Sequence, residues 1–170
     1  GRLRSLKVLG LSVNPQLRSL PAELGALTRL RQLVVGAARL EALPNEVGGL
    51  AALETLTLSG NRLRELPATV GDLGALTALD AGDNRLVQLP NSIGSLSSLR
   101  TLRVRENRLC ALPEAVGELR ALISLGACHN YLRSLPDLSR LCSLTHLGAA
   151  SNRLTSVNPA LCALPLTTLL

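Results

Sequence analysis

Side chains that serve in nucleophilic catalysis recur at one spacing in the second half of this 170-residue sequence. Two acids, a histidine and a serine stand 22 or 23 residues apart: Asp83, Glu106, His129 and Ser151. A hydroxyl, a base and an orienting carboxylate catalyse acyl transfer when they lie within hydrogen-bond reach of one another, beside an oxyanion stabiliser. The spacing raises the question of whether these side chains converge or only lie in a row.

A row is the arrangement that the sequence favours. Residues at the same position of successive strands lie about 4.8 Å apart and project in parallel, so they are poorly aimed at one another. An open row also excludes no water and supplies no oxyanion donor. We therefore expect a polar stripe with no catalytic residues, no enzyme activity and no cofactor.

A second set of side chains, Cys128, His129 and His146, has the donor atoms of a metal site. Adjacent residues on a strand point in different directions, and the sequence contains no Cys-x-x-Cys pair. We therefore expect no metal ligands. The cysteines are predicted to be free thiols in a reducing compartment, the cytoplasm: Cys110, Cys128, Cys142 and Cys162.

The recurring position belongs to a repeat that runs through the whole chain. Its leading leucines stand at steps of 22 to 24 residues: Leu3, Leu27, Leu50, Leu73, Leu96, Leu119, Leu141 and Leu164. Units of this length cannot bury their own apolar faces and stack on one another as a solenoid. We predict a single domain over 1–170, with units 3–26, 27–49, 50–72, 73–95, 96–118, 119–140 and 141–163 and the start of an eighth.

Each unit predicts one short strand followed by an asparagine. The alternation in Leu56-Thr57-Leu58 has the period of a strand, with one face inward and one outward. An amide side chain both donates and accepts, so it can satisfy backbone groups where the chain turns inside the stack. The predicted structural ladder is Asn61, Asn84, Asn107, Asn130 and Asn152.

Prolines and glycines in the second half of each unit predict a short helical turn. We interpret the prolines as the first residues of these turns: Pro67, Pro90 and Pro113. We interpret the glycines as the residues that end them in a left-handed conformation: Gly71, Gly94 and Gly117.

The complete unit, Leu-x-x-Leu-x-x-Leu-x-Leu-x-x-Asn-x-Leu-x-x-Leu-Pro-x-x-Val/Ile-Gly-x-Leu, resembles the leucine-rich repeat family. Its ending is similar to that of the intracellular Ras-suppressor-like and Scribble-like type. The resemblance implies an α/β solenoid: a leucine-rich repeat horseshoe with a concave parallel β-sheet and short helical or extended convex segments. It also implies binding of a protein partner on the concave face, in scaffolds or small-GTPase signalling.

The first units depart from this pattern. Ala38 stands where the asparagine is expected, so the second unit lacks that amide, and Pro15 and Gln16 lengthen the first unit by one residue. Neither end of the stack shows a polar capping unit, and the final LTTLL reads as the start of another strand. We expect the chain to be a piece of a longer protein.

Composition limits the partners. The net charge is +6, and 17 of the 18 basic residues are arginines, which suits a partner with an acidic surface. Binding of single-stranded nucleic acid usually needs several aromatic platforms, and Tyr131 is the only aromatic residue, so we expect no nucleic acid. There is no apolar run of the roughly 18 to 20 residues that a membrane helix needs, and we expect neither membrane nor small-molecule binding.

Partner contacts are expected from outward side chains, because the leucines only build the scaffold. Outward residues are small or neutral in the first three units and become charged or aromatic in the fourth to seventh. The predicted protein-binding residues are Asp80, Asp83, Arg103, Arg105, Glu106, His129, Tyr131 and His146. Directly after the asparagine position runs an arginine column, Arg39, Arg62, Arg85, Arg108 and Arg153, with Tyr131 in the slot of the sixth unit. We expect this column to be hydrated or paired with Asp83 and Glu106.

The function that we predict is a non-catalytic protein–protein interaction module, a scaffold or signalling adaptor. Two alternatives remain open at this stage. One is a structural repeat segment of a large stable assembly, and the other is the substrate-recognition arm of a larger enzyme such as a ubiquitin ligase.

Overall fold

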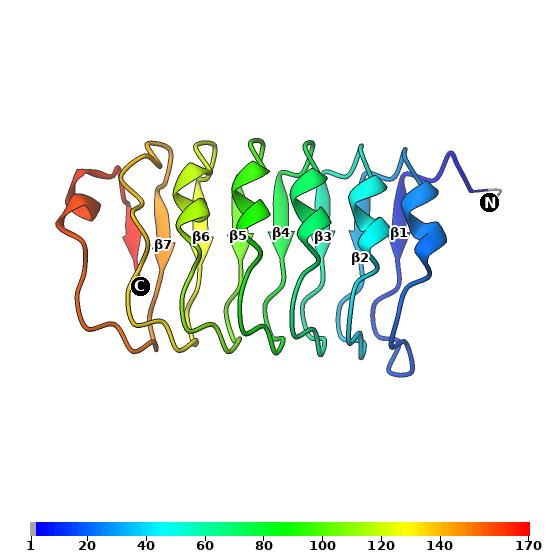
Figure 1. The fold of residues 1–170 in the computed structure, drawn as a ribbon, viewed down its shortest axis with the longest axis horizontal. Helices are drawn as coiled ribbons and strands as arrows, with labels where there is room; N and C mark the ends of the chain where they lie inside the picture. Colours follow the sequence, from blue (N-terminus) through cyan, green and yellow to red (C-terminus); the bar gives the residue numbers. More distant parts are fainter. Residues whose placement is uncertain (1–2) are drawn as a thin grey trace.

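One parallel β-sheet runs along the whole described part of the molecule. A computed structural model describes residues 3–170, in which the strands follow one another in the sheet in sequence order (Figure 1). The strands are β1 (Val8–Gly10), β2 (Gln32–Val34), β3 (Thr55–Thr57), β4 (Ala78–Asp80), β5 (Thr101–Arg103), β6 (Ser124–Gly126), β7 (His146–Gly148) and β8 (Thr168–Leu169). Each unit therefore adds one strand beside the last, as expected of a solenoid.

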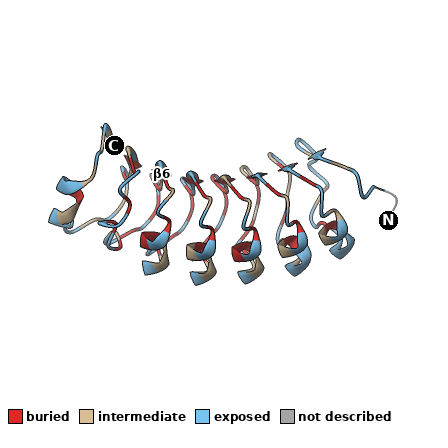
Figure 2. Ribbon diagram, turned by 90° about the horizontal axis from the view of Figure 1, so that it is seen from above, coloured by how far each residue is buried: buried red, intermediate tan, exposed pale blue. Residues whose placement is uncertain are grey.

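Short 3-10 helices cover the other side of the stack. They are η1 (Ala22–Ala26), η2 (Asn45–Gly49), η3 (Ala68–Asp72), η4 (Asn91–Ser95), η5 (Glu114–Glu118) and η6 (Pro159–Ala163). Figure 2 shows the strands along the inner side of a shallow arc and the 3-10 helices along its outer side. The predicted leucine-rich repeat solenoid is confirmed. Within residues 3–170, every helix is too short or too polar to cross a membrane.

The core lies between these two layers and consists almost entirely of leucine. In the third unit, Leu56 and Leu58 of the strand segment and Leu63 and Val70 of the returning segment have no exposed surface. The strand alternation turns Leu56 inward and its neighbours Thr55 and Thr57 outward. Equivalent leucines of successive units form one continuous core, so each unit is stabilised mainly by its neighbours.

The asparagine ladder joins each unit to the one before it. Asn107 shows the pattern: its Oδ1 accepts the Leu86 N–H at 2.9 Å, and its Nδ2 donates to the Ala81 carbonyl at 2.9 Å. Equivalent bonds are made by Asn61, Asn84, Asn130 and Asn152. Among the described residues, every buried side-chain nitrogen and oxygen has a hydrogen-bond partner. The ladder therefore satisfies backbone groups that the turns leave inside the stack.

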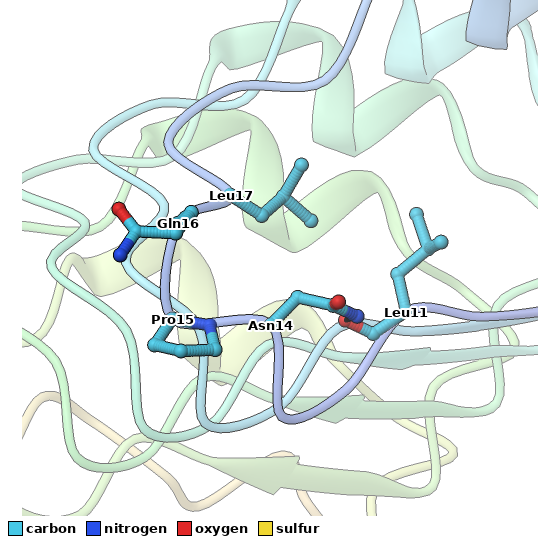
Figure 3. A pocket seen from close by; sticks show the side chains of 5 residues that line it. All are labelled: Leu11, Asn14, Pro15, Gln16 and Leu17. Carbon is cyan, nitrogen blue, oxygen red and sulfur yellow. Dashed lines mark hydrogen bonds between the residues drawn. The ribbon is translucent and has the colours of Figure 1, made fainter.

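The first unit shows how the chain manages without an amide at Ala38. In the regular units, the N–H two residues after one asparagine donates to the asparagine of the next unit. Leu63 N–H, for example, donates to Asn84 Oδ1 at 3.0 Å. Here Leu17 N–H donates instead to the Asn14 carbonyl at 2.9 Å, across a loop that contains Pro15 and Gln16. This loop surrounds a hollow of about 410 Å³ (Figure 3). The extra residue and the missing amide are thus parts of one local arrangement.

The predicted role of the glycines is wrong. Gly71, Gly94 and Gly117 do not have positive φ; each lies inside a 3-10 helix. A Cβ on Gly94 would stand 2.6 Å from the Ala115 carbonyl oxygen in the next unit. Glycine is required there because adjacent 3-10 helices pack backbone against backbone, and a Cβ would push the units apart.

The predicted role of the prolines is wrong by one position. Pro67 lies before the first residue of η3, with an extended backbone (φ −64°, ψ 148°), and its carbonyl accepts the Val70 N–H at 3.0 Å. Pro90 and Pro113 have the same place and conformation before η4 and η5. Proline suits this flanking position because an N–H there would have no partner in the turn, and proline has no N–H.

The shortened sixth unit replaces the 3-10 helix with a smaller turn. No 3-10 helix lies between β6 and β7 in the described chain. Instead, Asp137 Oδ1 accepts the Ser139 N–H at 2.9 Å, and this bond lowers the pKa of the Asp137 carboxyl below its usual value. An aspartate that bonds the backbone two residues on makes a compact turn, which fits a unit one residue shorter.

Candidate protein-binding face

Outward side chains form two columns along the concave face, on either side of the buried central leucines. The parallel register places Asp80 beside Arg103, Arg103 beside Gly126, and Gly126 beside Gly148. The other column holds the first residue of each strand and includes His146 of β7. Neighbours in one column lie about 4.8 Å apart, so Asp80 and Arg103 place opposite charges side by side.

Asp80 also holds the backbone at the end of its strand. Its Oδ1 accepts the Gly82 N–H at 3.0 Å, and the residue is half-buried. Arg103 and Arg105 are exposed and have no such bond to the backbone in residues 3–170. The two arginines are therefore available to a partner, while Asp80 has a structural role in addition to its charge.

A hollow of about 410 Å³, here called the concave hollow, lies over the last strands of the sheet. Four of the predicted binding residues line it together: Arg105, Glu106, His129 and His146. The rest of its lining is Ser124, Leu125, Gly126, Cys128, Leu147, Gly148, Thr168 and Leu170. The predicted residues Asp80, Asp83, Arg103 and Tyr131 lie outside it.

Two glycines open the concave hollow. Gly126 and Gly148 occupy the column position at which β5 carries Arg103, so no side chain fills the space above them. A Cβ on Gly148 would stand 2.9 Å from Cys128 Sγ, which is half-buried. Sequence reasoning missed this hollow, although the recurring Leu-Gly-Ala at 125–127 and 147–149 was a usable signal.

Charged and titratable groups stand at the edge of the concave hollow. Arg105 Nη1 and Glu106 Oε1 are 4.0 Å apart, both exposed, so this pair contributes little to stability. His146 Nδ1 lies 2.7 Å from Thr145 Oγ1, which fixes the ring toward the start of its strand. His129 is exposed in the turn that follows β6. The hollow thus offers a cation, an anion and two imidazoles around a floor of glycine and leucine.

The stripe of Asp83, Glu106, His129 and Ser151 lies where the chain leaves the sheet. All four residues have a left-handed backbone, with φ between 48° and 55°. Val13 (φ 59°) and Ala37 (φ 49°) have the same conformation in the first two units, and Gly60 fills this position in the third. Each N–H of Asp83, Glu106 and His129 donates to a carbonyl of the next unit. Among the described residues no side-chain hydrogen bond joins the four, so they lie in a row and do not assemble a nucleophile with a base.

Tyr131 lies in the arginine column, in the slot that its offset from the asparagine predicts, and it does not line the concave hollow. Its N–H donates to Leu109 O, as Arg108 N–H donates to Leu86 O, which places it in the arginine column. The Arg153 guanidinium lies over its ring, 4.5 Å from the centroid. The aromatic ring is therefore stacked against its neighbour in the column, away from the concave hollow.

Of the two expectations for the arginine column, hydration or pairing with Asp83 and Glu106, the pairing is not formed among the described residues. Glu106 lies nearest to Arg105 of its own unit, and neither Arg85 nor Arg108 forms an ion pair. In residues 3–170, no three acidic, histidine or cysteine side chains gather as metal ligands, although Cys128, His129 and His146 share the concave hollow. All four cysteines are unpaired.

Known structures share this architecture. The chain is similar to a TDR receptor (TM-score 0.91, 31% identity, 98% of this chain and 30% of that one). It is also similar to the leucine-rich repeat ectodomain of the membrane receptor kinase GASSHO1/SCHENGEN3 from Arabidopsis thaliana, solved in complex with CASPARIAN STRIP INTEGRITY FACTOR 2 (TM-score 0.86, 31% identity, 98% of this chain and 22% of that one). A third similar structure is YopM, a leucine-rich effector protein from Yersinia pestis (TM-score 0.83, 30% identity, 98% and 43%).

The chain spans less than half the length of each of these three proteins. No curated protein sequence matches it. A family model described as a leucine-rich repeat region matches residues 1–87, about half of the chain. Proteins of this fold generally mediate protein–protein interaction and are typically non-catalytic. The chain belongs to the leucine-rich repeat family.

Proposed function

We propose that this chain is a protein-binding module that holds its partner on the concave face of the fourth to seventh units. The concave hollow carries the proposal, because it brings Arg105, Glu106, His129 and His146 around one open space of about 410 Å³. Arg103 and Asp80 extend the charged surface toward the centre of the sheet. Mixed charges on a rigid sheet provide specificity and register for a partner more than raw affinity.

The glycine floor favours a partner that inserts a side chain. Gly126 and Gly148 leave the sheet backbone open at two neighbouring strands, with Leu125 and Leu147 beneath. An inserted side chain would be surrounded by apolar floor and polar rim, which is the usual anatomy of a protein interface. The partner surface that fits best is acidic, since Arg103 and Arg105 are both exposed and Arg105 has only a 4.0 Å pair with Glu106.

One similar protein supports a protein ligand. The similar ectodomain of GASSHO1/SCHENGEN3 was solved in complex with CASPARIAN STRIP INTEGRITY FACTOR 2. The LPxxVGxL ending of the units favours a scaffold or signalling adaptor of the Ras-suppressor-like or Scribble-like type, and four unpaired cysteines favour the cytoplasm.

Charge reversal on the concave face tests the proposal. Arg103→Glu combined with Arg105→Glu should weaken binding of a purified partner by about 2 kcal/mol, or roughly thirtyfold, because interface arginines are frequent hot spots. The fold should survive, since both side chains are exposed.

The matched control is Arg29→Glu combined with Arg120→Glu. Both residues are exposed in the turns that follow η1 and η5, away from the concave face, and the change in net charge is the same. A control pair that weakens binding as much as the concave pair would contradict the concave assignment.

A further inference from the structure

Four arginines gather along the edge of the stack where the chain turns away from the sheet. This is the edge toward which the strands point, the lower one in Figure 1. One hollow, of about 430 Å³, is lined by Glu41, Arg62, Arg64 and Arg85. A second, of about 330 Å³, is lined by Arg64, Arg85, Val87 and Arg108. Because Arg64 and Arg85 line both, the two hollows adjoin, and we call them together the arginine groove.

The positive charge of the arginine groove is almost uncompensated. Within residues 3–170, none of the four arginines forms an ion pair. Glu41 is the only acid that lines either hollow, and its Oε1 lies 3.6 Å from Arg18 Nη1. Like charges on neighbouring units repel, so these exposed or half-buried guanidinium groups are hydrated in the free chain, and a bound anion would relieve the repulsion.

The backbone beneath the arginine groove is held rigidly. Arg85 N–H donates to Leu63 O at 2.9 Å, and Arg108 N–H donates to Leu86 O at 2.9 Å. The leucine after Arg85 is fixed in turn, because its N–H donates to Asn107 Oδ1 at 2.9 Å. The asparagine ladder thus fixes the positions from which the guanidinium groups project, which lowers the entropy lost when a ligand binds.

We propose that the arginine groove binds a ligand that carries two neighbouring phosphate groups. A guanidinium presents a planar fork of donors, and a phosphate, with several oxygens and a charge near −2, accepts forks from more than one arginine. Two adjoining hollows that share Arg64 and Arg85 suit two phosphates held close together. This proposal is independent of the concave hollow, which lies over other residues.

Calorimetric titration with inorganic tripolyphosphate tests the site. At about 0.15 M salt, where long-range attraction is screened, we expect saturable binding to the wild-type chain. Arg64→Ala combined with Arg85→Ala should weaken it by about tenfold or more, because bonds to charged groups are lost. The control, Arg29→Ala combined with Arg120→Ala, removes the same charge from exposed turns and should change the affinity less than about twofold.

A second arm uses a peptide that is uncharged apart from two adjacent phosphoserines, together with its unphosphorylated form. Binding of tripolyphosphate alone identifies a free polyphosphate as the ligand, and binding of the phosphopeptide alone identifies a phosphorylated protein segment. Either result supports the site provided that the groove variant loses the binding. Absence of binding to both probes, or equal loss in the control variant, would overturn it.

Two further readouts separate binding from folding. Without ligand, the groove variant should keep or slightly raise the thermal midpoint, because charge repulsion is relieved. Arg85→Lys keeps the charge and loses the fork, so it should weaken tripolyphosphate binding while leaving the midpoint unchanged. A Lys variant that binds as well as the wild type would contradict phosphate recognition by the guanidinium forks.

Discussion

Asn107→Ala removes one rung of the asparagine ladder, and its cost can be estimated bond by bond. The Leu86 N–H, which donates to Asn107 Oδ1 at 2.9 Å, is left buried without a partner. The amide also donates to the carbonyls of Ala81, Val104 and Arg105 at 2.9 to 3.1 Å. These carbonyls keep other donors, namely Asn84, Asn130 and the Asp83 N–H. The unsatisfied N–H therefore dominates, at about 1–3 kcal/mol.

With the small cavity added, we expect the free energy of unfolding to fall by about 2–3 kcal/mol. In a chain of this size each kcal/mol lowers the thermal midpoint by about 2–4 °C, so the shift should be roughly 5–10 °C by circular dichroism. Asn107→Asp keeps the acceptor for Leu86 but turns a carboxylate toward three carbonyls. It should destabilise the protein at least as much as alanine does.

Asn14→Ala is the matched control. Asn14 is exposed, and its Nδ2 donates to Leu11 O at 2.9 Å and Ser12 O at 3.2 Å, while its Oδ1 accepts no buried N–H among the described bonds. Its loss should cost less than about 1 kcal/mol. If Asn107→Ala and Asn14→Ala lower the free energy of unfolding equally, the ladder does not stabilise the fold through its bonds to buried N–H groups.

Three further predictions concern the turns. Gly94→Ala should lower the free energy of unfolding, measured in urea, by about 1–3 kcal/mol, because its Cβ would meet the backbone of the next unit. Gly74→Ala, with open space around it, should be neutral or stabilising, and the reverse order would contradict the packing explanation. Ala38→Asn should raise the unfolding midpoint by gaining carbonyl partners, and a lowered midpoint would mean that the second unit turns differently. Once protonated, the Asp137 carboxyl accepts the Ser139 N–H only weakly, so its contribution to the free energy of unfolding is present above about pH 4 and is lost as the pH falls further. Asp137→Asn should therefore flatten this part of the curve of stability against pH, and an unchanged curve would contradict the assignment.

The repeating positions could be predicted because their spacing alone determines their environment. A leucine at a strand position such as Leu56 faces the core in every unit, and the asparagine offset places the amide at each turn. The glycines could not be interpreted from sequence in this way. A glycine such as Gly94 is required either for positive φ or for close approach, and only the neighbouring unit's backbone, 2.6 Å from its missing Cβ, distinguishes the two.

The candidate site could be predicted only in part, for a related reason. Arg103 and Gly126 are neighbours because the parallel register pairs them. A glycine that leaves a gap between larger side chains is therefore recognised only after the strands have been aligned. Tyr131 stands directly after its asparagine, the position of Arg108 in its own unit, and that offset assigns it to the arginine column. The sequence thus places Tyr131 in the arginine column and, as an outward residue of its unit, also among the predicted binding residues, and the three-dimensional arrangement is needed to choose between the two.

The side-chain NMR signals of three residues test the concave assignment most directly. The sequence has only two histidines, and both His129 and His146 line the concave hollow, while the only tyrosine, Tyr131, lies in the arginine column. On addition of a purified partner to the isotope-labelled chain, we expect both imidazole signals to shift or broaden and the Tyr131 ring signals to stay unchanged. A bound partner that leaves both imidazoles unchanged would contradict binding at the concave hollow.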